Sequence, residues 1–218
     1  MQSEKSVNID VESAVLPGDL VRPPGAKSLV IFAHGSGSSR LSTRNRFVAQ
    51  QLQKEGIATL LFDLLTEEED ETYENRFDIP LLTDRLVSVT HWVGVDARAK
   101  KLGTLGLPVG YFGASTGAAA ALGAAAHLDA EVGAVVSRGG RPDLAMESLA
   151  EVRAPTLLIV GGRDDVVIEL NRKAYALLKA EKELSIVPGA THLFEEPGAL
   201  EEVARLASEW FKKYLSKR

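Results

Sequence analysis

The fold of this chain is decided by the stretch Gly113-Ala-Ser-Thr-Gly117 and by what stands on either side of it. Before it runs an apolar segment, residues 107–112, with the character of a buried strand. After it runs a segment of small helix formers, residues 118–127. Ser115 therefore stands where a strand turns abruptly into a helix, the context of a G-x-S-x-G nucleophile elbow. We expect both glycines to be required, because side chains two residues before or after the serine would collide with the neighbouring strand and helix.

The rest of the chain alternates strand and helix patterns. Strands are predicted at residues 28–33, 58–62, 109–112, 132–137, 156–160 and 183–187, and helices at 43–55, 81–102, 115–127, 143–149, 167–180 and 200–215. Near-continuous apolar strands separated by crossovers indicate a mainly parallel sheet covered by helices on both faces. The alternating segments 7–12 and 14–21 predict an antiparallel hairpin at the sheet edge. We predict one α/β domain over residues 1–218.

Composition narrows the class of protein. The chain has 218 residues, 45% of them apolar, and a net charge of −5 with no block of Lys and Arg, so no nucleic-acid partner is expected. It has no cysteine, which excludes disulfides, thiolate metal sites and a cysteine nucleophile. The N-terminus lacks an apolar signal core and residues 118–126 are too short to span a bilayer, so no membrane partner and a cytoplasmic location are expected. The acidic run 66–73 is predicted to be a mobile exposed loop, with a lid over the site as the alternative.

Polar residues follow the predicted parallel strands at the positions where ligands bind in such sheets. In open α/β sheets these positions lie beyond the carboxyl ends of the strands. His34-Gly-Ser-Gly37 follows the first of these strands and Ser115 the central one. Gly161-Gly-Arg-Asp-Asp165 and Pro188-Gly-Ala-Thr-His192 follow later ones. A serine, a carboxylate and an imidazole thus appear on successive strand ends, in that order along the chain.

In these motifs the chain resembles the α/β-hydrolases, and among them the dienelactone hydrolase-like family. The resemblance runs from about Ser28 to the C-terminus and rests on His34–Gly37, Gly113–Gly117, Gly161–Val167 and Gly189–His192. It implies an α/β-hydrolase fold without a large cap domain. Dienelactone hydrolases proper use a cysteine nucleophile, and this chain has serine at that position, so the resemblance implies a serine-nucleophile variant.

The chemistry of a serine hydrolase assigns a role to each of these side chains. Ser115 is a weak nucleophile at neutral pH and needs a base within hydrogen-bond reach. His192 is predicted to be that base, because imidazole titrates near neutral pH. Asp164 is predicted to fix the imidazole tautomer and stabilise the imidazolium, as in the family pattern, with the adjacent Asp165 as the alternative.

The oxyanion of a tetrahedral intermediate needs hydrogen-bond donors. We expect these donors to be the backbone N–H groups of Thr116, at the start of a helix, and of Ser36, which stands between two glycines in the loop after the first parallel strand, residues 34–37, here called the oxyanion loop. His34 is expected to pack behind the oxyanion loop rather than to act as a base. No pair of histidines has metal-ligand spacing with a nearby carboxylate, so we expect no metal and no cofactor.

Arginines near the predicted strand ends suggest a charge preference for the substrate. Arg138 directly follows a strand and is predicted to bind an anionic group of a small-molecule substrate. The alternative is that Arg138 pairs with Asp143 and only holds its loop. Arg40, Arg44 and Arg46 cluster beyond the oxyanion loop and are weaker candidates for the same role.

Together these features predict a serine hydrolase that cleaves a small ester, lactone or thioester through an acyl-enzyme. An acyltransferase that uses the same triad is one alternative, because the two reactions differ in the acceptor and not in the catalytic residues. A non-catalytic binding or accessory module that retains the fold is another, because such domains occur fused to phosphoribosyltransferases in the wider family. The sequence does not determine the oligomeric state.

Overall fold

Eight strands form one sheet in the computed structural model, which describes residues 3–11, 14–95 and 97–215. Their order across the sheet is β1-β2-β4-β3-β5-β6-β7-β8. β3 to β8 pair in parallel, whereas β1 pairs with β2, and β2 with β4, in antiparallel. The predicted parallel sheet with an N-terminal hairpin is confirmed, and Glu12 of the predicted hairpin lies outside the described residues. The bounds are β1 (Ser3–Val11), β2 (Ala14–Arg22), β3 (Leu29–Ala33), β4 (Ala58–Phe62), β5 (Val109–Ala114), β6 (Val132–Arg138), β7 (Thr156–Gly161) and β8 (Lys182–Val187).

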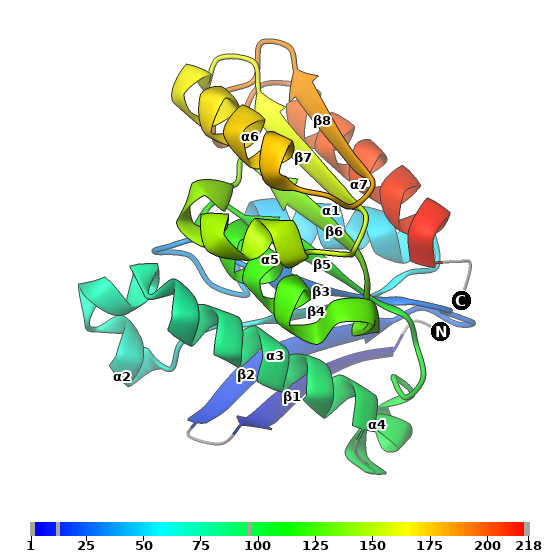
Figure 1. The fold of residues 1–218 in the computed structure, drawn as a ribbon. Helices are drawn as coiled ribbons and strands as arrows, with labels where there is room; N and C mark the ends of the chain where they lie inside the picture. The colour runs from blue at the N-terminus through cyan, green and yellow to red at the C-terminus, as the bar shows by residue number, and fades with distance from the viewer. Residues whose placement is uncertain (1–2, 12–13, 96, 216–218) are drawn as a thin grey trace.

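Helices cover both faces of this sheet (Figure 1), as the strand pattern predicts. α1 and α7 pack together on one face, and α3, α5 and α6 lie on the other. The bounds are α1 (Thr43–Lys54), α2 (Glu67–Asp70), α3 (Ile79–Val95), α4 (Ala97–Leu102), α5 (Thr116–Leu128), α6 (Asp165–Leu177) and α7 (Ala199–Leu215), with 3-10 helices η1 (Tyr73–Phe77), η2 (Asp129–Glu131) and η3 (Pro142–Glu151). Among the described helices none is long and apolar enough to cross a membrane.

Three predicted elements differ in detail from the observed ones. The helix predicted at 81–102 is two helices, α3 and α4, and Asp96 between them lies outside the described residues. The helix predicted at 143–149 is the 3-10 helix η3, kinked at Ala145. The helix predicted at 167–180 begins at Asp165 and ends at Leu177. Boundary shifts of this size are usual, because helix ends fray and cap residues compete for the first turn.

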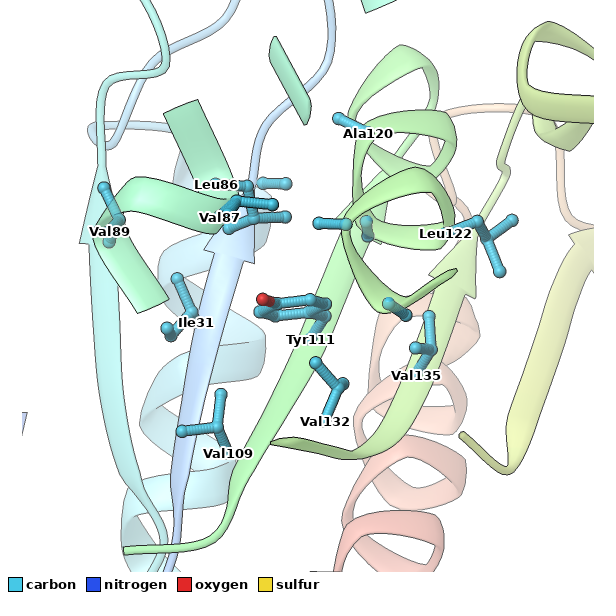
Figure 2. Packing of buried hydrophobic residues seen from close by; sticks show 14 of the residues in the cluster. Ile31, Leu86, Val87, Val89, Val109, Tyr111, Ala120, Leu122, Val132 and Val135 are labelled. Atoms are coloured by element: carbon cyan, nitrogen blue, oxygen red, sulfur yellow. The ribbon is translucent and has the colours of Figure 1, made fainter. Parts of the chain in front are cut away.

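The apolar core lies on both faces of the central strands. Beneath α3 and α5, the ring of Tyr111 packs among Ile31 and Leu86 (Figure 2), and its hydroxyl is 2.5 Å from Thr90 Oγ1. That hydrogen bond satisfies the polar end of a fully buried side chain, which would otherwise destabilise the fold. On the opposite face the rings of Phe32 and Phe112 stack, with centroids 4.9 Å apart, beneath α1 and α7. Because the same strands contribute to both clusters, they are held by packing from two sides.

The acidic run after β4 contains a capped helical turn, so the prediction of a loop is wrong for Glu67–Asp70. Thr66 and Glu69 form a reciprocal capping box at the start of α2, with side chain to backbone N–H distances of 3.1 and 2.9 Å. Glu69 also pairs with the buried Arg85 of α3. The run is therefore tied to α3, beside which α2 lies in Figure 1.

Candidate active site

Ser115 stands at a sharp turn between β5 and α5 with an unusual backbone conformation. Its φ is 51° and its ψ −121°, a region that costs a non-glycine residue on the order of 1–3 kcal/mol. A Cβ added at Gly113 would lie 2.5 Å from Ala118 Cα of α5, and one at Gly117 would overlap the carbonyl oxygens of Ala33 and His34. The predicted steric need for both glycines is confirmed. Backbone hydrogen bonds on both sides hold the strained turn, since Ser115 N–H donates to the Arg138 carbonyl at 3.3 Å and the Ser115 carbonyl accepts from Arg141 N–H at 3.0 Å.

His192 and Asp164 are hydrogen-bonded, with Nδ1 and Oδ2 2.6 Å apart. Asp164 is the N-cap residue of α6, and Asp165 is the first, exposed residue of that helix. Of the two adjacent carboxylates, the structure places Asp164 against the imidazole. When Nδ1 donates to the carboxylate, Nε2 keeps its lone pair and can accept a proton.

The segment that follows β6 lies between Ser115 and His192. The Arg138 carbonyl bonds to the Ser115 N–H, and a Cβ on the next residue, Gly139, would lie 3.5 Å from His192 Cε1. Within the described part of the chain the Ser115 hydroxyl makes no hydrogen bond to the imidazole. Catalytic hydrogen bonds often close up only when substrate is bound, so this geometry is compatible with a base next to its nucleophile.

Ser36 and Thr116, whose backbone N–H groups are the predicted oxyanion donors, are hydrogen-bonded to each other. The Ser36 N–H donates to Thr116 Oγ1 at 2.8 Å, across 80 residues of sequence. A Cβ at Gly35 would lie 3.0 Å from Ser115 Cβ, so only glycine allows the oxyanion loop to approach this closely. Because the Thr116 hydroxyl already accepts the Ser36 N–H, a substrate oxygen that uses this donor has to replace that hydroxyl.

His34 lies behind the oxyanion loop, as predicted. Its Nδ1 is 3.0 Å from the Gly35 carbonyl and its Nε2 accepts from Leu64 N–H at 3.1 Å. Burial lowers the pKa of His34, and the hydrogen bond to the Gly35 carbonyl and then the charges of Asp63 and Asp70 partly oppose this effect. The neutral imidazole thus connects the oxyanion loop to the chain that follows β4.

Arg138 is buried against α1 rather than exposed to solvent. Its side chain donates to Asn45 Oδ1 at 3.1 Å and its guanidinium lies 5.8 Å from the centre of the Phe194 ring. The alternative pairing with Asp143 is wrong, because Asp143 instead accepts two hydrogen bonds from Arg141, at 2.8 and 2.9 Å. Burial, followed by the nearby charge of Arg44, lowers the pKa of Arg138 to about 10.

The weaker arginine candidates all face carboxylates. Arg40 pairs with Asp63, Arg46 lies 3.7 Å from Asp19, and Arg44 pairs with Glu195 at 3.0 Å. Their charges are thus compensated within the protein. The Arg44 pair also connects α1 to the segment just after His192.

A small cavity of about 10 Å³ opens beside the oxyanion loop. One side of it is formed by the loop itself and Thr116, and the other by Leu64, Leu65, Asp70, Arg76 and Leu82. Sequence analysis did not identify this second side. The capping-box spacing of Thr66 and Glu69 was the available signal that the acidic run is helical. Among the described residues, no three His, Asp or Glu side chains are grouped so that they could hold a metal ion.

The fold is that of an α/β-hydrolase. The sequence profile of the dienelactone hydrolase family matches residues 16–216, and the chain therefore belongs to this family. A crystal structure of a dienelactone hydrolase from Anabaena variabilis superposes with a TM-score of 0.93 at 56% identity, covering 98% of this chain and 99% of that one. A cold-adapted esterase from an Arctic intertidal metagenomic library shares the fold, with a TM-score of 0.78 at 15% identity, covering 98% of this chain and 94% of that one.

Two curated relatives are named for a transferase and not for a hydrolase. They are Mycobacterium tuberculosis proteins from strains CDC 1551 and H37Rv, each 57% identical over 212 residues and each named provisionally as a phosphoribosyl transferase. The match covers 97% of this chain and 47% of each relative. The chain thus spans about half the length of these relatives.

Proposed function

We propose that this hydrolase cleaves a small ester, lactone or thioester through an acyl-enzyme on Ser115. The observation that carries the proposal is the 2.6 Å hydrogen bond between Asp164, after β7, and His192, after β8, at the same carboxyl edge of the sheet as the elbow of Ser115 after β5. A serine on a strained elbow, an imidazole and a carboxylate that orients it are the parts that acyl transfer through a serine requires.

In the proposed first step, Ser115 Oγ attacks the substrate carbonyl carbon while His192 Nε2 takes the hydroxyl proton. The carbonyl oxygen becomes an oxyanion that accepts from the N–H groups of Thr116 and Ser36. The tetrahedral intermediate collapses as His192 returns the proton to the leaving oxygen or sulfur. Water then attacks the acyl-enzyme with the same base, which releases the acid and restores the Ser115 hydroxyl.

Two alternatives share the fold. Acyl transfer to an alcohol or thiol uses the same residues, and product analysis with these acceptors added distinguishes it from hydrolysis. The phosphoribosyl transferase name belongs to relatives about twice as long as the match, which motivates the second alternative, an accessory role beside a transferase domain. In that role the chain would bind without turnover, so a demonstration that Ser115 is a reactive nucleophile would argue against it.

Labelling with a fluorophosphonate tests the proposal, because this probe reacts with a serine that a nearby base activates. We expect one adduct, on Ser115 by mass spectrometry, that is lost in Ser115→Ala and strongly reduced in His192→Ala. His91→Ala, a change at an exposed histidine of α3, is the matched control and should label like the wild type. Absence of labelling in a folded protein would contradict the hydrolase and favour the accessory role.

A further inference from the structure

Arg138 is a buried cation to which the proposed mechanism assigns no role. It is 5% exposed, and within the described residues its guanidinium contacts the Asn45 amide oxygen and the Phe194 ring but pairs with no carboxylate. Its Nε is buried there without a hydrogen-bond partner. A charge in such a place costs free energy, because neither water nor an opposite charge compensates it. Stability therefore does not explain why an arginine stands at this position.

The backbone of Arg138 belongs to the turn that holds the proposed nucleophile. Its carbonyl accepts the Ser115 N–H at 3.3 Å. The next residue, Gly139, borders the imidazole, since a Cβ there would lie 3.2 Å from the His192 carbonyl oxygen and 3.5 Å from His192 Cε1. The end of β6 therefore contacts both the proposed nucleophile and the proposed base, and their relative placement depends on it.

The side chain of Arg138 reaches the segment that carries His192. Its guanidinium lies 5.8 Å from the centre of the Phe194 ring, within the range of a cation–π contact. Phe194 is buried, and its φ of 56° is a left-handed conformation that is unfavourable for a bulky residue. Such a backbone persists only where the surrounding structure holds it. The contacts of the Phe194 ring with Arg138 and Gly139 contribute to that support.

The same side chain also reaches α1, the helix that follows the oxyanion loop. Its Nη2 donates to Asn45 Oδ1 at 3.1 Å, and Asn45 is buried in the first turn of that helix. A second contact joins α1 to the segment after His192, since Arg44 pairs with Glu195 at 3.0 Å. That pair is largely exposed and therefore contributes little. The buried contacts of Arg138 are the stronger connection.

We propose that Arg138 is a positioning residue, whose side chain fixes the segment of His192 relative to the elbow of Ser115. The proposal rests on the proposed hydrolase function. Asp164 holds the imidazole at Nδ1, but no hydrogen bond within the described residues joins the imidazole to Ser115. The separation of base and nucleophile is therefore set by the segments that carry them. A displacement of about 1 Å between reacting groups can lower the rate about a hundredfold. Arg138 thus acts on kcat and not on substrate binding.

Arg138→Met tests the proposal, because methionine fills much of the same apolar volume without the charge or the hydrogen bond to Asn45. The measurements are kcat and KM for p-nitrophenyl acetate, with active sites titrated by the fluorophosphonate, and the urea midpoint of unfolding. We expect kcat per titrated site to fall by about tenfold or more and KM to change by less than about twofold. The urea midpoint should change little, because loss of a buried unpaired charge offsets loss of the hydrogen bond.

Three further variants separate positioning from a purely structural role. Arg138→Lys keeps a charge near the ring and a donor for Asn45, and should restore part of the lost kcat. Phe194→Leu removes the ring but keeps an apolar side chain, and should lower kcat without raising KM. Combined with Arg138→Met it should cost no more than the stronger single change, because both act through one contact. Arg85→Met is the matched control: Arg85 is also 5% exposed but lies in α3, and kcat per titrated site should not change.

A second ester, the mono-p-nitrophenyl ester of glutaric acid, distinguishes positioning from binding of a substrate anion. A rise in KM for this ester alone in Arg138→Met, with kcat retained, would overturn positioning and make Arg138 a substrate-binding residue. Unchanged kcat per titrated site in Arg138→Met would also contradict the proposal. A loss of kcat that Arg138→Lys does not relieve and Arg85→Met reproduces would show a structural role only. Absence of Ser115-dependent turnover and labelling in the wild type would remove the hydrolase function itself, and positioning with it.

Discussion

Asp164 and Asp165 have the same side chain, but only Asp164 contacts His192. Asp164 is the N-cap residue of α6, but its carboxylate bonds to His192 and not to the helix, whereas Asp165 lies in the first turn and faces solvent. We therefore expect Asp164→Asn to lower kcat by about a thousandfold, because an amide no longer selects the productive imidazole tautomer. Asp165→Asn is the matched control and should change kcat less than about twofold. Steady-state kinetics on an acetyl ester, with circular dichroism to verify folding, measure both. Equal losses in the two variants would contradict the assignment.

His34 gives stability a dependence on pH. Burial lowers the pKa of His34 in the folded protein, so the folded state resists protonation while the unfolded chain takes up a proton near pH 6.5. The stabilisation is fully present above pH 6.5 and is lost as the pH falls from there toward the folded pKa. His34→Gln offers an amide oxygen to the Leu64 N–H and does not titrate. We expect urea unfolding of this variant between pH 7 and 5 to show a flatter stability profile than the wild type.

The control for that measurement is His91→Gln, which removes an exposed histidine from α3. It should keep the pH dependence of the wild type. If His34→Gln and the wild type lose free energy of unfolding in parallel as the pH falls, the titrating group is not His34.

Individual site residues differ in how far the sequence could place them. The positions of Ser115, Asp164 and His192 follow from the rule that parallel strands end at one edge, and the structure brings Asp164 and His192 into contact there. The direction of the Arg138 side chain does not follow from any pattern. β6 is buried on both faces, so alternation along the strand gives no indication of which side a residue faces.

At the scale of elements, the elbow between β5 and α5 depends on glycine for steric reasons. We expect Gly117→Ala to lower the free energy of unfolding by at least about 3 kcal/mol, because its Cβ would overlap backbone oxygens that cannot move aside without shifting β3. The control is Gly94→Ala in α3, where a Cβ meets nothing within 4 Å. That change should stabilise the protein by about 0.5–1 kcal/mol, because alanine favours helix. Urea denaturation of both variants measures the contrast, and similar effects of the two would contradict the steric argument.

Periodicity predicts the long elements of this fold but not the short helix α2. Long apolar strands and amphipathic helices were predicted from periodicity alone, because burial on a face repeats along the chain. The acidic run 66–73 has no apolar periodicity, and the sequence therefore predicts a loop there. Its helical turn instead depends on the local capping box and on Arg85, which is 16 residues from Glu69 and belongs to the next α-helix, α3. Contacts between a polar turn and one side chain of a neighbouring helix produce no periodic pattern in the sequence.

At the scale of the whole molecule, the predicted single domain has a direct consequence for unfolding. The central strands β3, β5, β6 and β7 contribute residues to the core clusters on both faces of the sheet. If the helices on one face unpack, the strands that also form the core on the other face become exposed to solvent. We therefore expect both faces to unfold in one cooperative transition.

The two tryptophans of the chain report on the two faces separately. Trp92 of α3 is buried in one cluster and Trp210 of α7 in the other. In Trp92→Phe only Trp210 remains to fluoresce, and in Trp210→Phe only Trp92. Within each variant we expect the fluorescence transition in urea to superimpose on the far-ultraviolet circular dichroism transition, because coincident probes are the signature of two-state unfolding. Comparison within one variant removes the effect of the substitution on stability. A fluorescence transition that precedes the circular dichroism transition in either variant would mean that one face unpacks by itself, and that the shared strands do not couple the two helical layers.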